Sequence, residues 1–121
     1  MHELSIALEI VRQAVEIARR HDAERIEEVE VQMGVLRLIQ PEALRMSFQA
    51  AAEGTVAEGA RLRLIEEQVV AVCNHCDCLF LPQTGDYTCP RCARADARVV
   101  AGNDIILKSI VCRAPEEAGV S

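Results

Sequence analysis

The chain has 121 residues, a formal net charge of −6 at pH 7 and 50% hydrophobic residues, which fits one small domain or one domain carrying an insert. Phe48, Phe80 and Tyr87 are its aromatic residues, so its core must be mainly aliphatic. The acidic charge disfavours nucleic acid as a partner, because phosphate binding needs a basic surface. Charged residues interrupt the first apolar segment, so we expect no signal peptide, no membrane span and a reducing, cytoplasmic location.

The first predicted element is an amphipathic helix of about four turns that begins almost at the first residue. Apolar residues recur at spacings of three and four, and charged residues occupy the opposite face. The predicted buried stripe is Leu4, Leu8, Val11, Val15 and Ala18, with Ala7 and Ala14 beside it. Arg19, Arg20 and His21 close the helix, where positive charge suits the helix dipole. We therefore expect His21 to be exposed and not a metal ligand.

A strand and a second helix are predicted next. Apolar and polar side chains alternate over residues 29–33, which indicates a strand with one face in water, and Gly34 ends or bulges it. Pro41 suits the first position of a helix, and Gly54 suits a C-terminal cap. We therefore predict a helix from about 41 to 53.

Two further strands are predicted, one on each side of a cysteine-rich segment. Residues 61–72 begin with alternating arginine and leucine and lead into that segment. Residues 105–112 are a β-branched apolar run, which predicts a core strand buried on both faces. Cys112 in this run is expected to be a small buried hydrophobe. The predicted fold class is α+β, with a small three-stranded sheet, two helices and an inserted zinc-ribbon-like module.

Four cysteines form two pairs, Cys73-x2-Cys76 and Cys89-x2-Cys92, with twelve residues between the pairs. A C-x2-C turn directs two thiolates to one point, and two such turns supply the tetrahedral sulfur ligands that Zn²⁺ prefers. The spacing predicts a structural Zn(Cys)4 site. Cys78 is interpreted as a spare thiol beside it, because using Cys78 as a ligand would leave Cys73 without a role.

The predicted insert, residues 73–98, is too short to bury enough apolar surface alone, so zinc must supply its stability. Its expected small core is Leu79, Phe80 and Tyr87. We predict two domains. Residues 1–72, completed by a strand at 103–113, form an α/β domain, and residues 73–98 form the zinc-binding domain.

The chain opens with Met1-His2-Glu3, which has no evident role in a core. The amine of Met1 and the amide nitrogen and imidazole of His2 could close chelate rings around one divalent ion, with Glu3 completing the shell. Nitrogen donors in such an arrangement suit Ni²⁺ or Cu²⁺. The alternative is an ordinary exposed histidine with no metal role.

Several segments together resemble the HypA/HybF family of hydrogenase nickel-incorporation proteins. The matching segments are Met1–Ala7, the helix from Pro41 through Thr55, Leu64–Glu67, both cysteine pairs and Gly102–Ile110. The resemblance covers nearly the whole chain. It implies that His2 is the principal nickel ligand, that Glu3 assists it, and that Cys73, Cys76, Cys89 and Cys92 hold zinc.

The resemblance also implies a metallochaperone that delivers Ni²⁺ to the large subunit of a [NiFe]-hydrogenase with a HypB-type GTPase, and in some organisms serves urease with its accessory proteins. The chain contains no G-x4-G-K-[ST] motif, so it needs a partner for nucleotide chemistry. Its histidines, His2, His21 and His75, suggest no catalytic group, so we expect no enzyme activity. We expect a monomer or a weak homodimer.

Two other classes of protein remain open on the residues alone. A zinc-ribbon adaptor that binds protein or nucleic acid would need the cysteine pairs but not His2. A thiol redox protein would use the C-x2-C pairs directly, and it would need exposed thiols of low pKa.

Overall fold

The computed structural model describes residues 2–83 and 85–114, except for the side chain of His2. The chain divides into two units. Unit 1 is Met1–Val31, Ile39–Leu64 and Leu107–Ser121, and unit 2 is Gln32–Leu38 and Ile65–Ile106. The helices in the described part of the chain are too short or too polar to cross a lipid bilayer.

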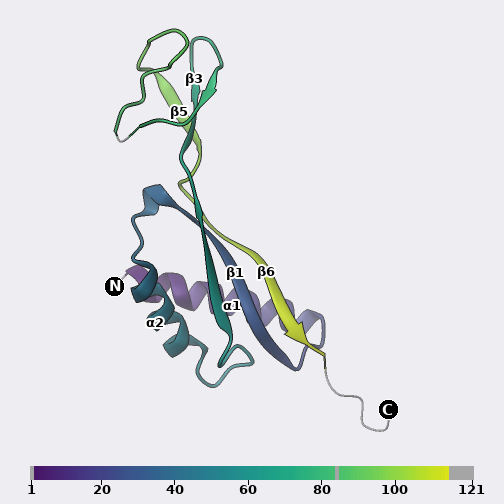
Figure 1. The fold of residues 1–121 in the computed structure, drawn as a ribbon. Helices are drawn as coiled ribbons and strands as arrows, with labels where there is room; N and C mark the ends of the chain where they lie inside the picture. Colours follow the sequence, from purple (N-terminus) through teal and green to yellow (C-terminus); the bar gives the residue numbers. More distant parts are fainter. Residues whose placement is uncertain (1, 84, 115–121) are drawn as a thin grey trace. The chain divides into compact units, whose positions relative to one another are not determined.

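A three-stranded sheet has the order β2-β1-β6, and α1 passes across one face of it (Figure 1). Its strands are β1 (Arg25–Gly34), β2 (Arg61–Glu67) and β6 (Ile105–Arg113). In β1, Val29, Val31 and Met33 are buried, as their alternation predicts. On the other face, Glu28 and Glu30 pair with arginines of β2 at 3.7 and 3.5 Å, so charge matching adds to the register of these strands.

The helix α1 (His2–Arg20) buries a stripe that overlaps the predicted one at Val11 and Ala18 and is shifted toward the flanking alanines. Its buried residues are Ala7, Ile10, Val11, Ala14 and Ala18. The predicted core residues Leu4 and Leu8 are instead 47% and 51% exposed. Small alanine side chains allow close approach of the helix to its neighbours, so the alanines take the centre of the packed face and the leucines lie at its edge.

The helix α2 (Pro41–Ala52) matches its prediction closely. Pro41 occupies the first turn, and Leu44, Phe48 and Ala52 form the buried face at a spacing of four. Gly54 has a φ of +79°, which is the left-handed conformation that favours glycine after a helix. α1 and α2 pack on each other, which gives unit 1 a core between its helices and its sheet.

The expectation that residues 105–112 form a strand buried on both faces is wrong. β6 is an edge strand of its sheet, and Ile106 and Val111 are 42% and 48% exposed. Cys112 is only partly buried. A β-branched run indicates strand propensity, and it does not distinguish a central strand from an edge strand.

Unit 2 contains a second sheet of order β4-β3-β5, which the sequence did not predict (Figure 1). Its strands are β3 (Val70–Cys73), β4 (Leu79–Phe80) and β5 (Ala97–Ala101). The single strand predicted over 61–72 is therefore two strands, β2 and β3, which belong to different sheets.

The small core of unit 2 contains Ala71, Cys73, Phe80 and Cys89, with Tyr87 packed against it. Leu79, predicted to join this core, is 66% exposed. Leu79 and Phe80 are consecutive residues of one strand, so their side chains point to opposite faces and only one of them reaches the core.

Candidate metal centre

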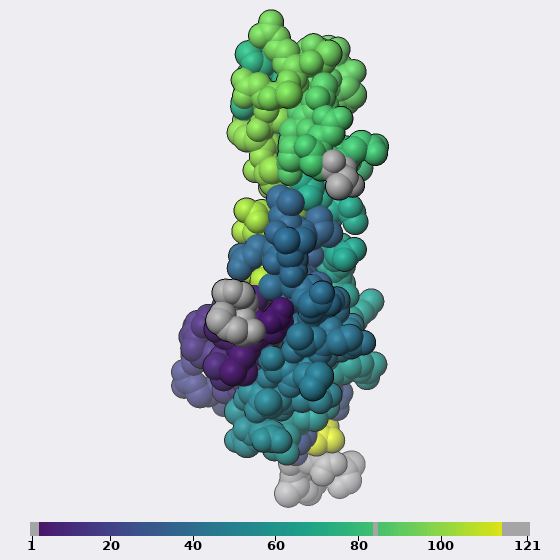
Figure 2. Space-filling model, turned by 90° about the vertical axis from the view of Figure 1, so that its left-hand side faces the viewer, coloured from purple at the N-terminus to yellow at the C-terminus, as the bar shows by residue number. Residues whose placement is uncertain are grey.

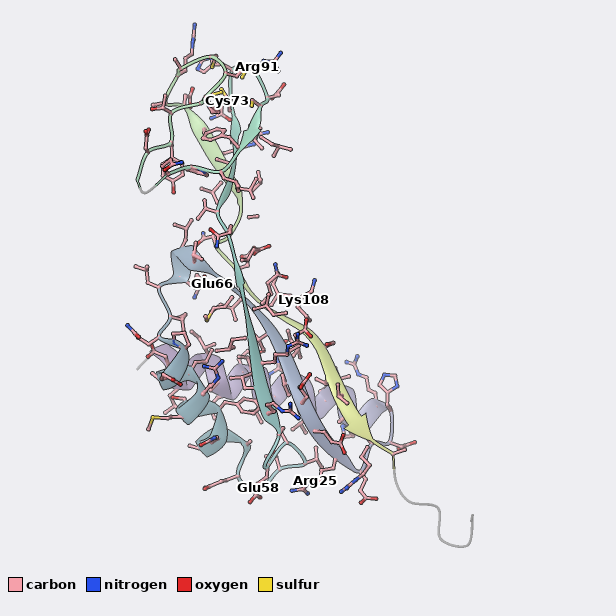
Figure 3. All side chains as sticks on the ribbon, in the orientation of Figure 1. Arg25, Glu58, Glu66, Cys73, Arg91 and Lys108 are labelled. Atoms are coloured by element: carbon pink, nitrogen blue, oxygen red, sulfur yellow. The ribbon has the colours of Figure 1, made fainter. Side chains whose placement is uncertain are left out.

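Four thiols meet at one end of unit 2. The Sγ atoms of Cys73, Cys76, Cys89 and Cys92 all lie within 4.8 Å of one another. The Cys73–Cys92 and Cys76–Cys89 sulfur pairs are each 3.5 Å apart. A tetrahedral zinc with Zn–S bonds of about 2.3 Å separates its sulfurs by about 3.8 Å. Figure 3 shows sulfur atoms close to Cys73, with Arg91 at the same end of the unit.

The two cysteine pairs have the same backbone turn. In the first turn, the His75 N–H points to Cys73 Sγ at 3.4 Å, and the Asp77 N–H donates to the Cys73 carbonyl at 3.0 Å. In the second turn, the corresponding donors are Arg91, at 3.4 Å from Cys89 Sγ, and Ala93, at 2.9 Å from the Cys89 carbonyl. Asp77 and Ala93 both have positive φ. The repeated geometry explains how C-x2-C aims both thiols inward.

Backbone N–H groups make the first cysteine of each pair a better thiolate. The N–H groups of Cys76 and His75 lower the pKa of Cys73. Burial raises the pKa of Cys89, but the N–H groups of Cys92 and Arg91 outweigh it and lower the pKa to about 6. A thiolate is the metal-binding form of cysteine, so the turns prepare these residues as ligands.

The two remaining cysteines lie outside this cluster. Cys78 Sγ points to the carbonyl of Leu79 at 3.5 Å, and the Cys78 carbonyl accepts the N–H of Cys73. Cys112 lies on β6, and burial raises its pKa. All six cysteines are free. The structure therefore brings together the four cysteines of the predicted pairs and leaves Cys78 and Cys112 apart from them.

The predicted nickel residues stand at the start of α1. His2 is the first residue of the helix, but its side chain and Met1 lie outside the described residues. Glu3 is half-buried, and its pKa is lowered by its own backbone N–H and by that of Gln40, which precedes α2. Figure 2 shows the start of α1, in purple, beside blue residues at the start of α2. The Glu3 carboxylate thus has one backbone partner in the first turn of α1 and one immediately before α2.

The other two histidines of the chain are not part of the thiol cluster. His21 is exposed at the end of α1, as predicted. His75 lies within the first cysteine turn, where its Nε2 is 2.8 Å from Asp96 Oδ2.

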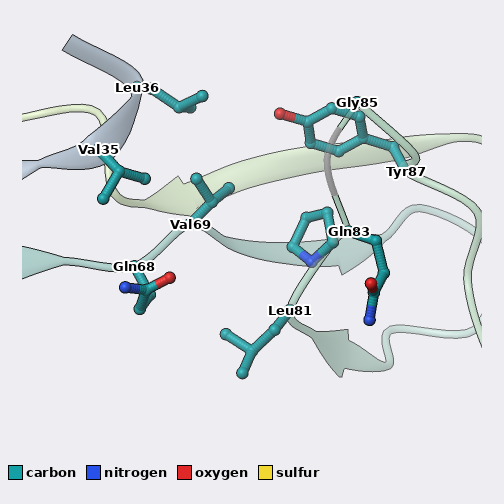
Figure 4. Close-up of a pocket in the computed structure, with 9 residues that line it drawn as sticks. Val35, Leu36, Gln68, Val69, Leu81, Gln83, Gly85 and Tyr87 are labelled. Atoms are coloured by element: carbon teal, nitrogen blue, oxygen red, sulfur yellow. The ribbon is translucent and has the colours of Figure 1, made fainter. Parts of the chain in front are cut away.

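A hollow of about 290 Å³ also lies within unit 2 (Figure 4). Its lining residues are Val35, Leu36, Gln68, Val69, Leu81, Pro82, Gln83, Gly85 and Tyr87. These residues include no histidine, cysteine or carboxylate, so the hollow offers none of the usual metal ligands.

A small α+β fold with four thiols that could hold one metal ion defines the class of small proteins that carry a four-cysteine metal site. The family described as "Hydrogenase/urease nickel incorporation, metallochaperone, hypA" matches residues 1–112. The chain belongs to this HypA family, as its sequence motifs predicted.

Curated relatives have the same family name. The hydrogenase maturation factor HypA of Chlorobium limicola is 44% identical over 110 residues, which cover 91% of this chain and 95% of the relative. The hydrogenase maturation factor HypA of Chloroflexus aurantiacus is 39% identical over 111 residues, with 91% and 97% covered. This chain is therefore similar to hydrogenase maturation factors over nearly its full length.

Solved structures confirm the fold class. The solution structure of the Ni metallochaperone HypA from Helicobacter pylori is similar with a TM-score of 0.72 and 26% identity, covering 93% of this chain and 98% of that one. A second solution structure of a HypA protein gives a TM-score of 0.77 at 26% identity, with 95% and 98% covered. The α+β fold with two helices and small sheets is thus that of the family.

Proposed function

We propose that this protein carries Ni²⁺ at its N-terminus as cargo for the large subunit of a [NiFe]-hydrogenase, and that its four-thiol cluster holds one structural Zn²⁺. The main support is the family match over residues 1–112, which includes both the N-terminal residues and the cysteine pairs. The turns also lower the pKa of Cys73 and Cys89, the first cysteine of each pair, which favours their thiolate form.

The zinc assignment rests on the donor set. Cys73, Cys76, Cys89 and Cys92 supply four sulfurs at nearly tetrahedral spacing. Four thiolates around Zn²⁺ leave no open position for a water or a substrate, so the metal is structural. When bound, it supplies stability to a unit whose core is small.

The nickel assignment rests on the place of His2 in the fold. The first N–H groups of a helix have no acceptor within it, so the His2 amide is not committed to the hydrogen-bond ladder of α1. That amide, the imidazole and the Met1 amine can chelate Ni²⁺ together, with Glu3 as an auxiliary ligand. A chelate at a chain end can both take up its ion and release it to a partner.

The proposed partners follow from the match to the family of hydrogenase and urease nickel-incorporation proteins. The chain contains no P-loop motif of its own, and we assign the nucleotide chemistry to a GTPase of the HypB type. Urease accessory proteins are further partners where the organism makes urease. The acidic charge favours these protein partners over nucleic acid.

Complementation tests the proposed function. In a hydrogenase-producing strain that lacks its own HypA-type protein, the wild-type chain should restore hydrogenase activity and a His2→Ala variant expressed at the same level should not. Equal restoration by both chains would contradict a role for His2 in nickel delivery.

A further inference from the structure

Asp96, which directly precedes β5, forms hydrogen bonds with the first cysteine turn. Its backbone carbonyl accepts the N–H of Asn74 at 2.9 Å, and its Oδ1 accepts the Asn74 side-chain amide at 2.9 Å. Its Oδ2 lies 2.8 Å from His75 Nε2. Asn74 and His75 are the two residues between Cys73 and Cys76, so one residue holds the whole interior of this turn.

Two arginines complete the arrangement around Asp96. Arg98 donates to Asn74 Oδ1 at 2.6 Å, and Arg94 Nη1 lies 3.2 Å from His75 Nδ1. Arginine can only donate, so Nδ1 accepts and Nε2 carries the hydrogen that Asp96 accepts. Asn74 and His75 are therefore each held from two sides.

The contacts of Asp96 continue the β-sheet beyond the metal ligand. In the ladder between β3 and β5, Cys73 pairs with Ala97 and Val72 pairs with Arg98. The Asn74–Asp96 backbone hydrogen bond lies one residue further along both strands. Cys73 is thus enclosed between paired strands and the Asp96 contacts, which restricts movement of its thiol.

In the second cysteine turn, the residues between the cysteines have no equivalent side-chain contacts. Its interior residues are Pro90 and Arg91, and among the residues that the structure describes neither side chain makes a hydrogen bond or an ion pair. Its hydrogen bonds come from backbone donors: the Cys89 N–H to the Arg94 carbonyl, the Ala93 N–H to the Cys89 carbonyl and the Arg91 N–H to Cys89 Sγ. The backbone turns are alike, but only in the first turn are the side chains of the two residues between the cysteines held by other residues.

We propose that Asp96 is a positioning residue of the thiol cluster, which fixes the first cysteine turn so that bound zinc is lost by opening of the second turn. The inference rests on the proposed zinc site. Zinc leaves such a cage as its sulfurs dissociate in turn, so the less restrained pair, Cys89 and Cys92, separates first. Partners around a metal site commonly change metal retention by 10- to 100-fold when they are removed.

Chelator-driven zinc release is the first test. An Asp96→Ala variant of the full chain, loaded with one Zn²⁺, should release it to excess EDTA on the order of tenfold faster than wild type. Asp96→Asn should be intermediate, because its amide oxygen still accepts from Asn74 while its amide nitrogen cannot accept from His75. Asp104→Ala is the matched control, because Asp104 is an exposed carboxylate of unit 2 whose side chain makes no ion pair or hydrogen bond with any residue of the described ranges 2–83 and 85–114. An Asp96→Ala release rate equal to that of the control would overturn the proposal.

The order in which the thiols become reactive is the second test. During the EDTA challenge, pulses of iodoacetamide followed by peptide mass spectrometry should label Cys92 before Cys76 and Cys89 before Cys73. These comparisons are matched, since Cys73 and Cys89 are both buried and Cys76 and Cys92 both half-buried. In Asp96→Ala this order should disappear, whereas a general loss of stability would speed all four sites equally and preserve it.

Two results separate this inference from the proposed zinc site. If Asp96→Ala does not fold, Arg98→Ala can replace it, because this change removes only the donor to Asn74. Arg98→Ala should also reduce the difference in labelling between the two cysteine turns. A wild-type protein that binds no stoichiometric zinc would contradict the zinc site itself. Simultaneous labelling of both turns in a zinc-loaded wild-type protein would contradict only the role of Asp96.

Discussion

Gly34 lies so close to Gly102 that a Cβ atom on Gly34 would be 2.4 Å from the carbonyl carbon of Gly102. The Gly34 N–H donates to the carbonyl of Asp104 at 2.8 Å, and the Leu36 N–H donates to that of Gly102 at 2.9 Å. The obstructing atoms belong to the backbone and cannot rotate away as a flexible side chain would. The absence of a side chain at Gly34 therefore permits these two hydrogen bonds of unit 2.

Gly34→Ala should weaken this contact by about 1–3 kcal/mol, the usual cost of overpacking. Native-state amide exchange measured by NMR should show faster exchange at residues 34 and 36. Gly54→Ala is the control for local strain without a clash. Its Cβ meets nothing within 4 Å, but the φ of +79° disfavours alanine, so this variant should destabilise unit 1 and leave exchange at residues 34 and 36 unchanged. Unchanged exchange at both amides in Gly34→Ala would contradict this prediction, because it would show that the backbones at Gly34 and Gly102 accommodate the added Cβ with no loss of stability.

The core of unit 1 gives a second prediction. Phe48 is 1% exposed on α2, so Phe48→Ala removes a large buried ring and should lower the free energy of unfolding by about 3–5 kcal/mol. Met46 is on the same helix but 71% exposed, so Met46→Ala should change it by about 0.5 kcal/mol or less. Urea titration followed by circular dichroism measures both, and similar values for the two variants would contradict the described face of α2.

Sequence periodicity predicted α2 and β1 well because each buries one full face with large side chains. The same reasoning predicted the buried side of α1 but misplaced its centre. A wide apolar arc shows that one side of a helix is buried, but it does not show that Ala7 and Ala14, and not Leu4 and Leu8, occupy the centre of that side. β6 was misjudged for a related reason, since its place at the edge depends on pairing with β1, which lies far away in the sequence.

The candidate site was predictable from the sequence only where its residues are close together in the chain. C-x2-C spacing is a property of single turns, so the four-thiol cluster followed from the sequence. Asp96 was not singled out, because it lies 22 residues from Asn74 and belongs to no motif. β5, which brings these two residues together, is short and mostly exposed and has no clear periodicity.

Removal of single thiols gives a third prediction. Serine at any one of Cys73, Cys76, Cys89 or Cys92 should abolish stoichiometric zinc, because the remaining three sulfurs leave the cage open. Cys78→Ser and Cys112→Ser should retain one Zn²⁺ per chain. Elemental analysis of the purified variants checks this. Zinc loss in Cys78→Ser with retention in Cys73→Ser would show that the ligand set is wrong.

Zinc removal gives a fourth prediction, on the independence of the two units. Unit 1 holds both helices and a core that contains none of the four thiols of the cluster, whereas the core of unit 2 includes Cys73 and Cys89. A chelator should therefore disorder unit 2 and leave most of the helical circular dichroism signal at 222 nm. The control is addition of zinc back to the same sample. Loss of the whole helical signal would mean that the two units fold as one.

The nickel site should depend on both groups of the chain end. His2→Ala removes the imidazole, and a short uncleaved N-terminal extension converts the Met1 amine into an amide while leaving the imidazole intact. Both changes should abolish stoichiometric Ni²⁺ binding. Glu3→Gln should weaken it less, since the Glu3 carboxylate is an auxiliary group that also has backbone partners. Zinc content should stay at one per chain in all three proteins, because the thiol cluster lies in the other unit.

Calorimetric titration of the zinc-loaded wild-type protein and its His2→Ala variant with Ni²⁺ is the most direct test of the central proposal. The account predicts one Ni²⁺ per wild-type chain and no stoichiometric binding by the variant. One Ni²⁺ bound to His2→Ala with unchanged affinity would contradict the nickel site.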